Sequence, residues 1–260
     1  MQDLLKIASQ ASIAGGALLR GYFGQELPFR EKAGSDIVTE ADLASEATIR
    51  AILQTACPAF NIFSEEQGLT DKGSEYTWFV DPLDGTHNFV TGIPQFGVSI
   101  ALVHYHKTVL GVVYQPMTDT LWSAMDGNGA QRNAMPFSVR QSEDIQRATI
   151  AYIQGYAAKK ASAKVIQNAL SDHAKRVVAN WAPSLDWCLL AEGRIAGLVS
   201  LDSEREDQLA GTCIAREAGV LVTDFTGTAY DPGMTRFLAT THPALQAAMI
   251  KVLATIDLDE

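Results

Sequence analysis

Two acidic segments hold the side chains that are best suited to chemistry. In the first, an apolar run over residues 78–80 ends directly at Asp81, and Asp84 follows three residues later. Such a run is typical of the end of a buried strand. The proline between the carboxylates stiffens the turn, and Gly85 lets the backbone approach a ligand closely. Carboxylates at the carboxyl end of a strand are well placed to bind a hard cation such as Mg²⁺.

The second acidic segment has the same form. Residues 62–64 read as a strand end, and Glu65 and Glu66 follow it. If the two strands are neighbours, Glu65, Asp81 and Asp84 form a metal cluster at one edge of a sheet. The Asp81 segment alone also fits a surface turn, because Asp-Pro and Asp-Gly are common turn formers. The second segment favours the metal cluster.

Hydrophobic spacing predicts the elements that must position these residues. Helices are predicted over 3–23, 43–56, 159–170, 184–192, 207–218 and 243–256. Strands are predicted over 96–103, 109–114, 120–125, 148–152, 176–179, 195–201, 221–225 and 237–240, the first two as a hairpin. Helices and strands therefore alternate along the chain, which indicates a layered fold of mixed α and β structure.

Composition excludes several classes of protein. The 260 residues are 47% hydrophobic, which is enough for one large domain or two tightly joined halves. The net charge of −10 argues against a nucleic-acid partner, although bound divalent cations would reverse the sign locally. The sequence shows no apolar run long enough to cross a membrane and no signal peptide. The scattered Cys57, Cys188 and Cys213 fit reduced thiols in a cytoplasmic protein.

The acidic motif and its surroundings resemble a known family. Residues 81–86, Asp-Pro-Leu-Asp-Gly-Thr, preceded by Glu65 and Glu66, are similar to the motif of the inositol monophosphatase family of Mg²⁺-dependent phosphomonoesterases. Segments 36–42, 185–194 and 207–219 resemble the same family in order and at matching spacing. The resemblance covers nearly the whole chain.

The resemblance implies an α/β (mixed α+β) fold, a layered αβαβα sandwich of the inositol monophosphatase and fructose-1,6-bisphosphatase type. An N-terminal half, 1–135, would carry most metal ligands. A C-terminal half, 136–260, would carry Asp207 and the segment that lines the substrate pocket. Relatives are commonly homodimers, so a homodimer is the expectation here.

The resemblance also assigns roles to single residues. The implied ligands for two or three Mg²⁺ ions are Glu65, Asp81, the backbone carbonyl of Leu83, Asp84 and Asp207. Thr86 and Asp42, assisted by Glu65, would orient and deprotonate the attacking water. The implied substrate contacts are Asp84, Gly85, Thr86, Lys32, Trp181, Ser184 and Ser200. Phosphate would meet the peptide N–H groups at Gly85 and Thr86, with Lys32 close by.

Several of these residues also have ordinary structural interpretations. Asp207 fits a simple cap at the start of a helix, where the dipole favours a carboxylate. Thr86 fits an N-cap, and Lys32 fits a solvated lysine in a loop. Trp181 fits a core aromatic residue where a helix begins.

Three positions depart from the family pattern. Glu206 stands where the family usually has a tryptophan, immediately before Asp207. Residues 181–184, Trp-Ala-Pro-Ser, replace a Gly-Ser-Ala-Ala-like stretch, and Pro183 has no N–H to offer a substrate hydroxyl. Ser200 stands where animal relatives carry an acid that contacts inositol. These changes weigh against inositol phosphate itself and leave the phosphate chemistry untouched.

The expected function is hydrolysis of a small phosphorylated alcohol by metal-activated water. Inositol monophosphate-like compounds and histidinol phosphate are the first candidates, and the segment 88–94 favours those branches. A 3′(2′),5′-bisphosphate nucleotidase or fructose-1,6-bisphosphatase activity is the alternative on the same fold. A regulatory protein-binding module is the alternative of another class, because some bacterial relatives bind the transcription machinery.

Overall fold

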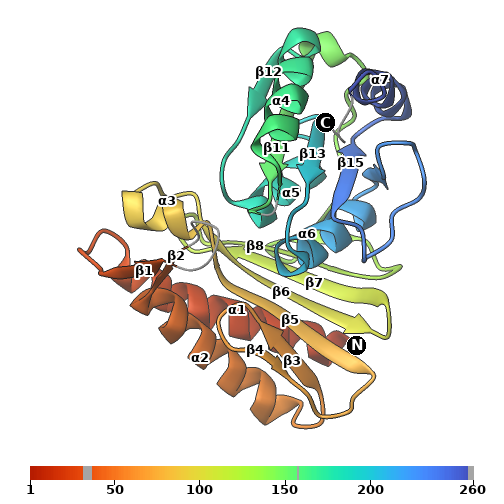
Figure 1. Cartoon of the computed structure of the whole chain (residues 1–260). Coiled ribbons are helices and arrows are strands. Elements are labelled where there is room, and N and C mark those ends of the chain that lie inside the picture. Colours follow the sequence, from red (N-terminus) through yellow and green to blue (C-terminus); the bar gives the residue numbers. More distant parts are fainter. Residues whose placement is uncertain (32–36, 157, 257–260) are drawn as a thin grey trace.

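The chain folds into five layers in which helices alternate with sheets (Figure 1). The computed structural model describes residues 1–31, 37–156 and 158–256. From the N-terminal side, the layers are a helix pair, an eight-stranded sheet, a second helix pair, a five-stranded sheet and a third helix pair. This order confirms the α/β (mixed α+β) αβαβα sandwich expected from the sequence.

The first layer consists of α1 (Gln2–Tyr22) and α2 (Glu40–Ala56), which cover one face of the large sheet. Gly15 of α1 lies so close to α2 that an added Cβ would come within 3 Å of Ser45 and Ile49. The small residue therefore sets how closely the two helices approach. A two-stranded hairpin of β1 (Phe29–Glu31) and β2 (Ile37–Thr39) precedes α2.

The eight-stranded sheet forms the second layer, with the order β10-β9-β8-β7-β6-β5-β3-β4. Its strands are β3 (Asn61–Ser64), β4 (Gly68–Thr70), β5 (Tyr76–Asp84), β6 (Gly97–His104), β7 (Lys107–Gln115), β8 (Thr120–Met125), β9 (Ala130–Arg132) and β10 (Met135–Phe137). Neighbouring strands are antiparallel except β3 and β5, which run parallel. The predicted hairpin is confirmed as β6 and β7. The short helix α3 (Thr86–Thr91) follows β5.

The remaining layers belong to the C-terminal part of the chain. The middle helices are α5 (Pro183–Ala191) and α6 (Arg205–Glu217), which lie between the two sheets. The five-stranded sheet has the order β12-β11-β13-β15-β14, with strands β11 (Thr149–Gln154), β12 (Arg176–Val178), β13 (Gly197–Leu201), β14 (Leu221–Thr223) and β15 (Arg236–Thr240). Its outer face carries α4 (Lys160–His173) and α7 (Pro243–Leu253), and a 3₁₀ turn (Ile145–Arg147) precedes β11.

Three clusters of buried apolar side chains hold the layers together. One lies between α1, α2 and the large sheet, around Trp78 and Ile49. A second surrounds α5 and α6, around Trp187, and a third lies beneath α4 and α7, around Ile166 and Met249. Every layer interface is therefore apolar, which fixes the middle helices between the sheets.

The division into halves at 135 and 136 stays a prediction. The boundary falls within β10, and α6 from the second half packs against β6 and β7 of the first. The three cysteines are buried and free, as the sequence indicated. Among the described residues, no helix is long and apolar enough to span a membrane.

Candidate functional site

The parallel pairing of β3 with β5 brings the two acidic segments together. Ser64, the last residue of β3, pairs with Val80, and Glu65 and Asp81 follow them directly. The backbone N–H of Glu65 donates to the carbonyl of Val80 at 3.2 Å. The condition set by the sequence, that the two strands be neighbours, is therefore met.

A break in the pairing of β5 with β6 places Asp81 and Asp84 on one side of the sheet. Asp81 pairs with Ser99 and Asp84 pairs with Gly97, so three steps along β5 oppose two along β6. Side chains three residues apart point to opposite faces of a regular strand. One extra residue corrects this, and both carboxylates line the same cavity.

The C-terminal part of the chain reaches this strand end through α5 and α6. Ser184, near the start of α5, donates to Asp84 Oδ2 from its backbone N–H at 3.0 Å and from its hydroxyl at 2.5 Å. Asp207 lies in the first turn of α6 and borders the same cavity. Side chains more than 100 residues apart in the sequence thus meet at one place.

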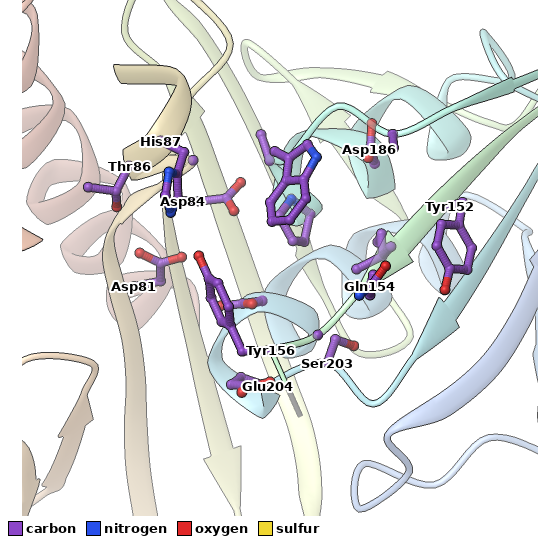
Figure 2. Close-up of a pocket in the computed structure, with 18 of the residues that line it drawn as sticks. Asp81, Asp84, Thr86, His87, Tyr152, Gln154, Tyr156, Asp186, Ser203 and Glu204 are labelled. Atoms are coloured by element: carbon purple, nitrogen blue, oxygen red, sulfur yellow. The ribbon is translucent and has the colours of Figure 1, made fainter. Parts of the chain in front are cut away.

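Figure 2 shows the cavity between the two sets of residues. Asp81, Asp84 and Thr86 come from β5 and α3 on one side, and Asp186 and Glu204 come from the other. The cavity has about 110 Å³ of space open to the centre of a water molecule. Its acidic lining residues are Glu65, Asp81, Asp84, Asp186, Glu204 and Asp207. Among the described residues, no lysine or arginine lines it.

The electrostatics of the cavity follow from this crowding of carboxylates. Burial, then the charges of Glu65, Asp84 and Asp207, raises the pKa of Asp81 well above its usual range. Burial, followed by the charges of Asp84 and Glu65, also raises the pKa of Asp207 well above its usual range. Burial raises the pKa of Asp84 to about 7, although the bonds from Ser184 oppose the shift. The carboxylates are therefore costly to ionise together without a compensating charge.

The donor set fits a hard divalent cation, because it consists of carboxylate oxygens and backbone carbonyls. Across the described residues, however, no three His, Cys, Asp or Glu side chains stand in an arrangement that could hold an ion as they are. Asp84 is turned toward Ser184, and like charges repel one another. The side chains line one cavity, but they are not drawn into a closed ligand set.

Thr86 and Asp42 form a contact beside the cavity. The Thr86 hydroxyl lies 3.1 Å from Asp42 Oδ1 and 3.0 Å from the Leu83 carbonyl, and it can donate to either. Asp42 Oδ2 accepts from the backbone N–H of Thr39 at 2.8 Å as part of the capping box of α2. Burial raises the pKa of Asp42 to about 6, while the bonds from Thr39 oppose the shift. Thr86 itself lines the cavity, and Asp42 lies behind it.

Two of the structural interpretations of helix starts are wrong. The N-cap of α6 is Glu204, so Asp207 is not the cap. The N-cap of α3 is Gly85, whose φ of 89° is left-handed, and the Thr86 hydroxyl turns back to Leu83. Glycine suits this position, because a Cβ would lie 2.9 Å from the Gln95 carbonyl.

The other predicted substrate contacts separate into three groups. Trp181 lines the cavity and is 51% exposed, so its interpretation as a core aromatic residue is wrong. Ser200 is fully buried on β13, where its hydroxyl bonds the Ser203 hydroxyl at 2.5 Å, and Ser203 lines the cavity in its place. Lys32 lies outside the described residues.

Sequence reasoning missed the side chain that joins the two sides of the site. Asn88, in α3, donates from Nδ2 to the Gln95 carbonyl at 2.8 Å and to the Asn180 carbonyl at 2.7 Å. Asn180 in turn donates to Asp186, a buried carboxylate in the cavity wall. No local pattern marks the contact of Asn88 with Asn180, because the two residues lie 92 positions apart in the sequence.

A second group that sequence reasoning missed holds Glu65 in place. Arg50 of α2 is 6% exposed and donates to the Ser64 hydroxyl at 2.6 Å and to the Thr70 hydroxyl at 2.5 Å. Glu46, one turn earlier, accepts from the backbone N–H of Gln67 at 3.1 Å. Helix α2 therefore forms hydrogen bonds with residues on both sides of Glu65. Glu46 and Arg50 are four positions apart, which places them on one face of α2, and this spacing is the sequence signal that could have identified the pair.

Comparison with known proteins places this site in context. A sequence model described as the inositol monophosphatase family matches residues 1–258. The Nus factor SuhB of Vibrio cholerae is 37% identical over 232 residues, 87% of each chain. A fructose-1,6-bisphosphatase/inositol-1-monophosphatase of Aquifex aeolicus is 32% identical over 229 residues, 86% of each chain.

Solved structures agree with the sequence comparison. The inositol monophosphatase of Anabaena superposes with a TM-score of 0.88 at 30% identity, covering 99% of this chain and 98% of its own. The extragenic suppressor protein suhB of Bartonella henselae has a TM-score of 0.90 at 28% identity, covering 96% and 98%. Since the family model, the relatives and the solved structures agree over most of its length, the chain belongs to the inositol monophosphatase family.

Proposed function

We propose that the protein is a Mg²⁺-dependent phosphomonoesterase that hydrolyses a small phosphorylated alcohol. The observation that carries the proposal is the acidic cavity, where carboxylates from both parts of the chain face one space without a lysine or arginine among the described lining residues. An anionic substrate requires positive charge there, and bound cations would supply it. Membership of a phosphatase family supports the same conclusion.

The proposed metal ligands are Glu65, Asp81, the Leu83 carbonyl, Asp84 and Asp207. Bound Mg²⁺ would supply Lewis-acid charge that activates water and neutralises a leaving oxygen. The chain's own groups then have definite tasks. Thr86 can accept a hydrogen bond from water while its own proton points to Asp42 or Leu83. With a pKa of about 6, Asp42 can exchange a proton through Thr86 near neutral pH.

The substitution Asp84→Asn tests the proposal. It keeps the shape of the side chain and an acceptor for Ser184 but removes the charge, so Mg²⁺-dependent phosphate release should fall by a factor of about 10² or more. Phosphate release is measured across Mg²⁺ concentrations with inositol 1-phosphate, histidinol phosphate, fructose 1,6-bisphosphate and a 3′-phosphorylated adenosine bisphosphate. Asp3→Asn is the matched control, because Asp3 is an exposed carboxylate on α1. Near-normal activity of Asp84→Asn would show that the cluster is assigned wrongly.

A second candidate function is a regulatory protein-binding module on the same fold. The observation in its favour is the name Nus factor SuhB, carried by several relatives at 32% to 37% identity. The two functions separate if a purified regulatory partner binds Asp84→Asn as tightly as the wild type. No phosphate release from any substrate, with such binding retained, would favour the module. The absence of a nucleic-acid partner, a homodimer and a cytoplasmic location stay predictions, the first supported by the net charge of −10.

A further inference from the structure

An exposed tryptophan in an unfavourable backbone conformation stands at the mouth of the cavity. Trp181 has a φ of 53°, in the left-handed region that bulky residues rarely occupy, and its side chain is 51% exposed. Neither burial nor backbone preference explains a large apolar ring at this position. Strained residues that line cavities are characteristic of binding sites.

The backbone around Trp181 is held from the opposite side of the cavity. Asn88 Nδ2 donates to the Asn180 carbonyl at 2.7 Å, with the Trp181 carbonyl at 3.4 Å. The Trp181 carbonyl oxygen also packs closely against Gly85, because a Cβ added to Gly85 would lie only 3.2 Å from it. The backbone at Asn180 and Trp181 is therefore held by contacts with Asn88 and Gly85, and this backbone sets the direction of the indole.

Trp181 lines two cavities, the acidic cavity and a second one, here called the outer cavity. The outer cavity has about 450 Å³ of space open to the centre of a water molecule, roughly four times that of the acidic cavity. The two share His87, Gln154, Gly155, Tyr156 and Trp181. The His87 ring meets the Trp181 ring edge to face, with 6.2 Å between centroids. Figure 2 shows Tyr156 between the residues of β5 and those of β11.

We propose that the outer cavity binds a planar ring carried by the alcohol part of the phosphate ester, with the ring stacked on Trp181. The inference rests on the proposed function, since the acidic cavity must hold the phosphate. The aromatic faces of Trp181 and Tyr156 offer stacking, which is insensitive to the detailed pattern of ring substituents. The preferred substrates are therefore phosphomonoesters with an aromatic or heteroaromatic ring a few bonds from the ester oxygen, ahead of polyol phosphates.

The test is a cycle in which the ring is removed from the protein, from the substrate and from both. The esters are 2-phenylethyl phosphate and ethyl phosphate, which carry the same charge and ester bond. For the wild type, kcat/KM should be about tenfold higher for the phenyl ester, and Trp181→Ala should bring the ratio of the two kcat/KM values close to one. Trp181→Phe should restore most of it. The polyol inositol 1-phosphate should behave like ethyl phosphate.

Two controls separate stacking from a change in folding. Trp181→Gly suits the positive φ and also removes the ring, so it should match Trp181→Ala in kinetics. Tyr105→Ala is the matched control, because Tyr105 is also an aromatic residue at a φ of 53° and is 60% exposed in the turn between β6 and β7. It should keep the preference for the phenyl ester.

The proposal is overturned if Trp181→Ala changes kcat/KM by the same factor for both esters, or if the wild type shows no preference between them. If no ester releases phosphate, the proposed function fails and the ring site is decided by calorimetry. In that case, 2-phenylethyl phosphate that binds the wild type more tightly than Trp181→Ala supports the ring site. Equal affinities overturn it.

Discussion

At the scale of single residues, Asp186 is a carboxyl group with an unusual environment. It is 1% exposed in the wall of the cavity, and Asn180 Nδ2 donates to its Oδ1 at 2.5 Å. Burial raises its pKa to about 7, although the Asn180 bond opposes the shift. Among the described residues that line the cavity there is no lysine or arginine to balance it, so its charge is costly in the folded protein.

We therefore expect Asp186→Asn to stabilise the protein above neutral pH. Well below pH 4 the group is protonated in both the folded and the unfolded state, so it makes no difference to the free energy of unfolding. As pH rises from about 4 to about 7, the unfolded state loses the proton first, so the ionisable group costs up to about 4 kcal/mol of stability. Asparagine keeps the acceptor for Asn180 without that cost.

Urea unfolding at pH 4, 5.5, 7 and 8 measures the effect. The stability of Asp186→Asn relative to the wild type should grow between pH 4 and pH 7 and then stay level. Asp172→Asn, on an exposed position of α4, is the control and should show no such growth. A difference that is the same at every pH would contradict the expectation.

At the scale of elements, the contact of α6 with the large sheet sets the position of Asp207. Gly111 of β7 faces Ala210 of α6, and a Cβ on Gly111 would lie 2.5 Å from the Ala210 carbonyl oxygen. Backbone cannot give way as a flexible side chain can. We expect Gly111→Ala to destabilise the fold by about 1–3 kcal/mol and to lower kcat/KM, because α6 must move and Asp207 moves with it.

The measurements are the midpoint of urea unfolding and the rate of phosphate release. Gly21→Ala is the matched control, since Gly21 lies in α1 with nothing within 4 Å of an added Cβ. It should be neutral or stabilising by up to about 1 kcal/mol, because alanine is the better helix former. If Gly111→Ala keeps wild-type stability, the close packing of α6 is not what places Asp207.

The elements show where sequence reasoning succeeds. Apolar spacing predicted α1, the β6 and β7 hairpin, and the alternation of helices and strands in the C-terminal part, because those segments bury one face or both. The predicted strand end before Glu65 is confirmed, whereas the strand expected to end at Val80 runs on to Asp84, with an irregularity between Asp81 and Asp84. The three-residue strands β9 and β10 at the sheet edge are half exposed and carry too little periodicity to be recognised.

The site shows where sequence reasoning stops. Glu65 and Asp81 could be found because a charged residue directly after an apolar run is conspicuous, whereas Asp207 was assigned by the family resemblance. Asn88 acts through a carbonyl 92 positions away that only the fold brings near, so no local pattern identifies it. Arg50 left only the weak signal of its spacing from Glu46 on α2. The left-handed backbone of Trp181 is equally invisible in the sequence, and the residue was therefore open to interpretation as core.

At the scale of the whole molecule, the proposed cation site joins the two parts of the chain. Asp81 comes from the eight-stranded sheet, and Asp207 comes from α6 in the middle layer. A cation that binds only the folded state raises stability by about 2.7 kcal/mol at a hundred times its Kd. We expect Mg²⁺ to raise the Tm at pH 8 and expect Asp207→Asn to lose most of that rise.

The melting temperature is measured with Mg²⁺ and with sodium chloride of equal ionic strength, which separates binding from simple screening. Asp172→Asn is again the control and should respond to Mg²⁺ like the wild type. An equal rise for Asp207→Asn and the wild type would place Asp207 outside the site. This readout does not depend on activity, so it also applies if the protein is a binding module.

The uneven pairing at the end of β5 has a consequence for the number of oxygen atoms that this strand end can offer. Three steps from Asp81 to Asp84 oppose two on β6, and both acids line the cavity because one residue is extra. A regular strand would also place two acids on one face, but only with a single residue between them. The extra position therefore adds a second peptide unit between the acids without turning either acid away. With it the strand end gains one more backbone carbonyl beside the two carboxylates, the kind of oxygen that a hard cation accepts as a ligand.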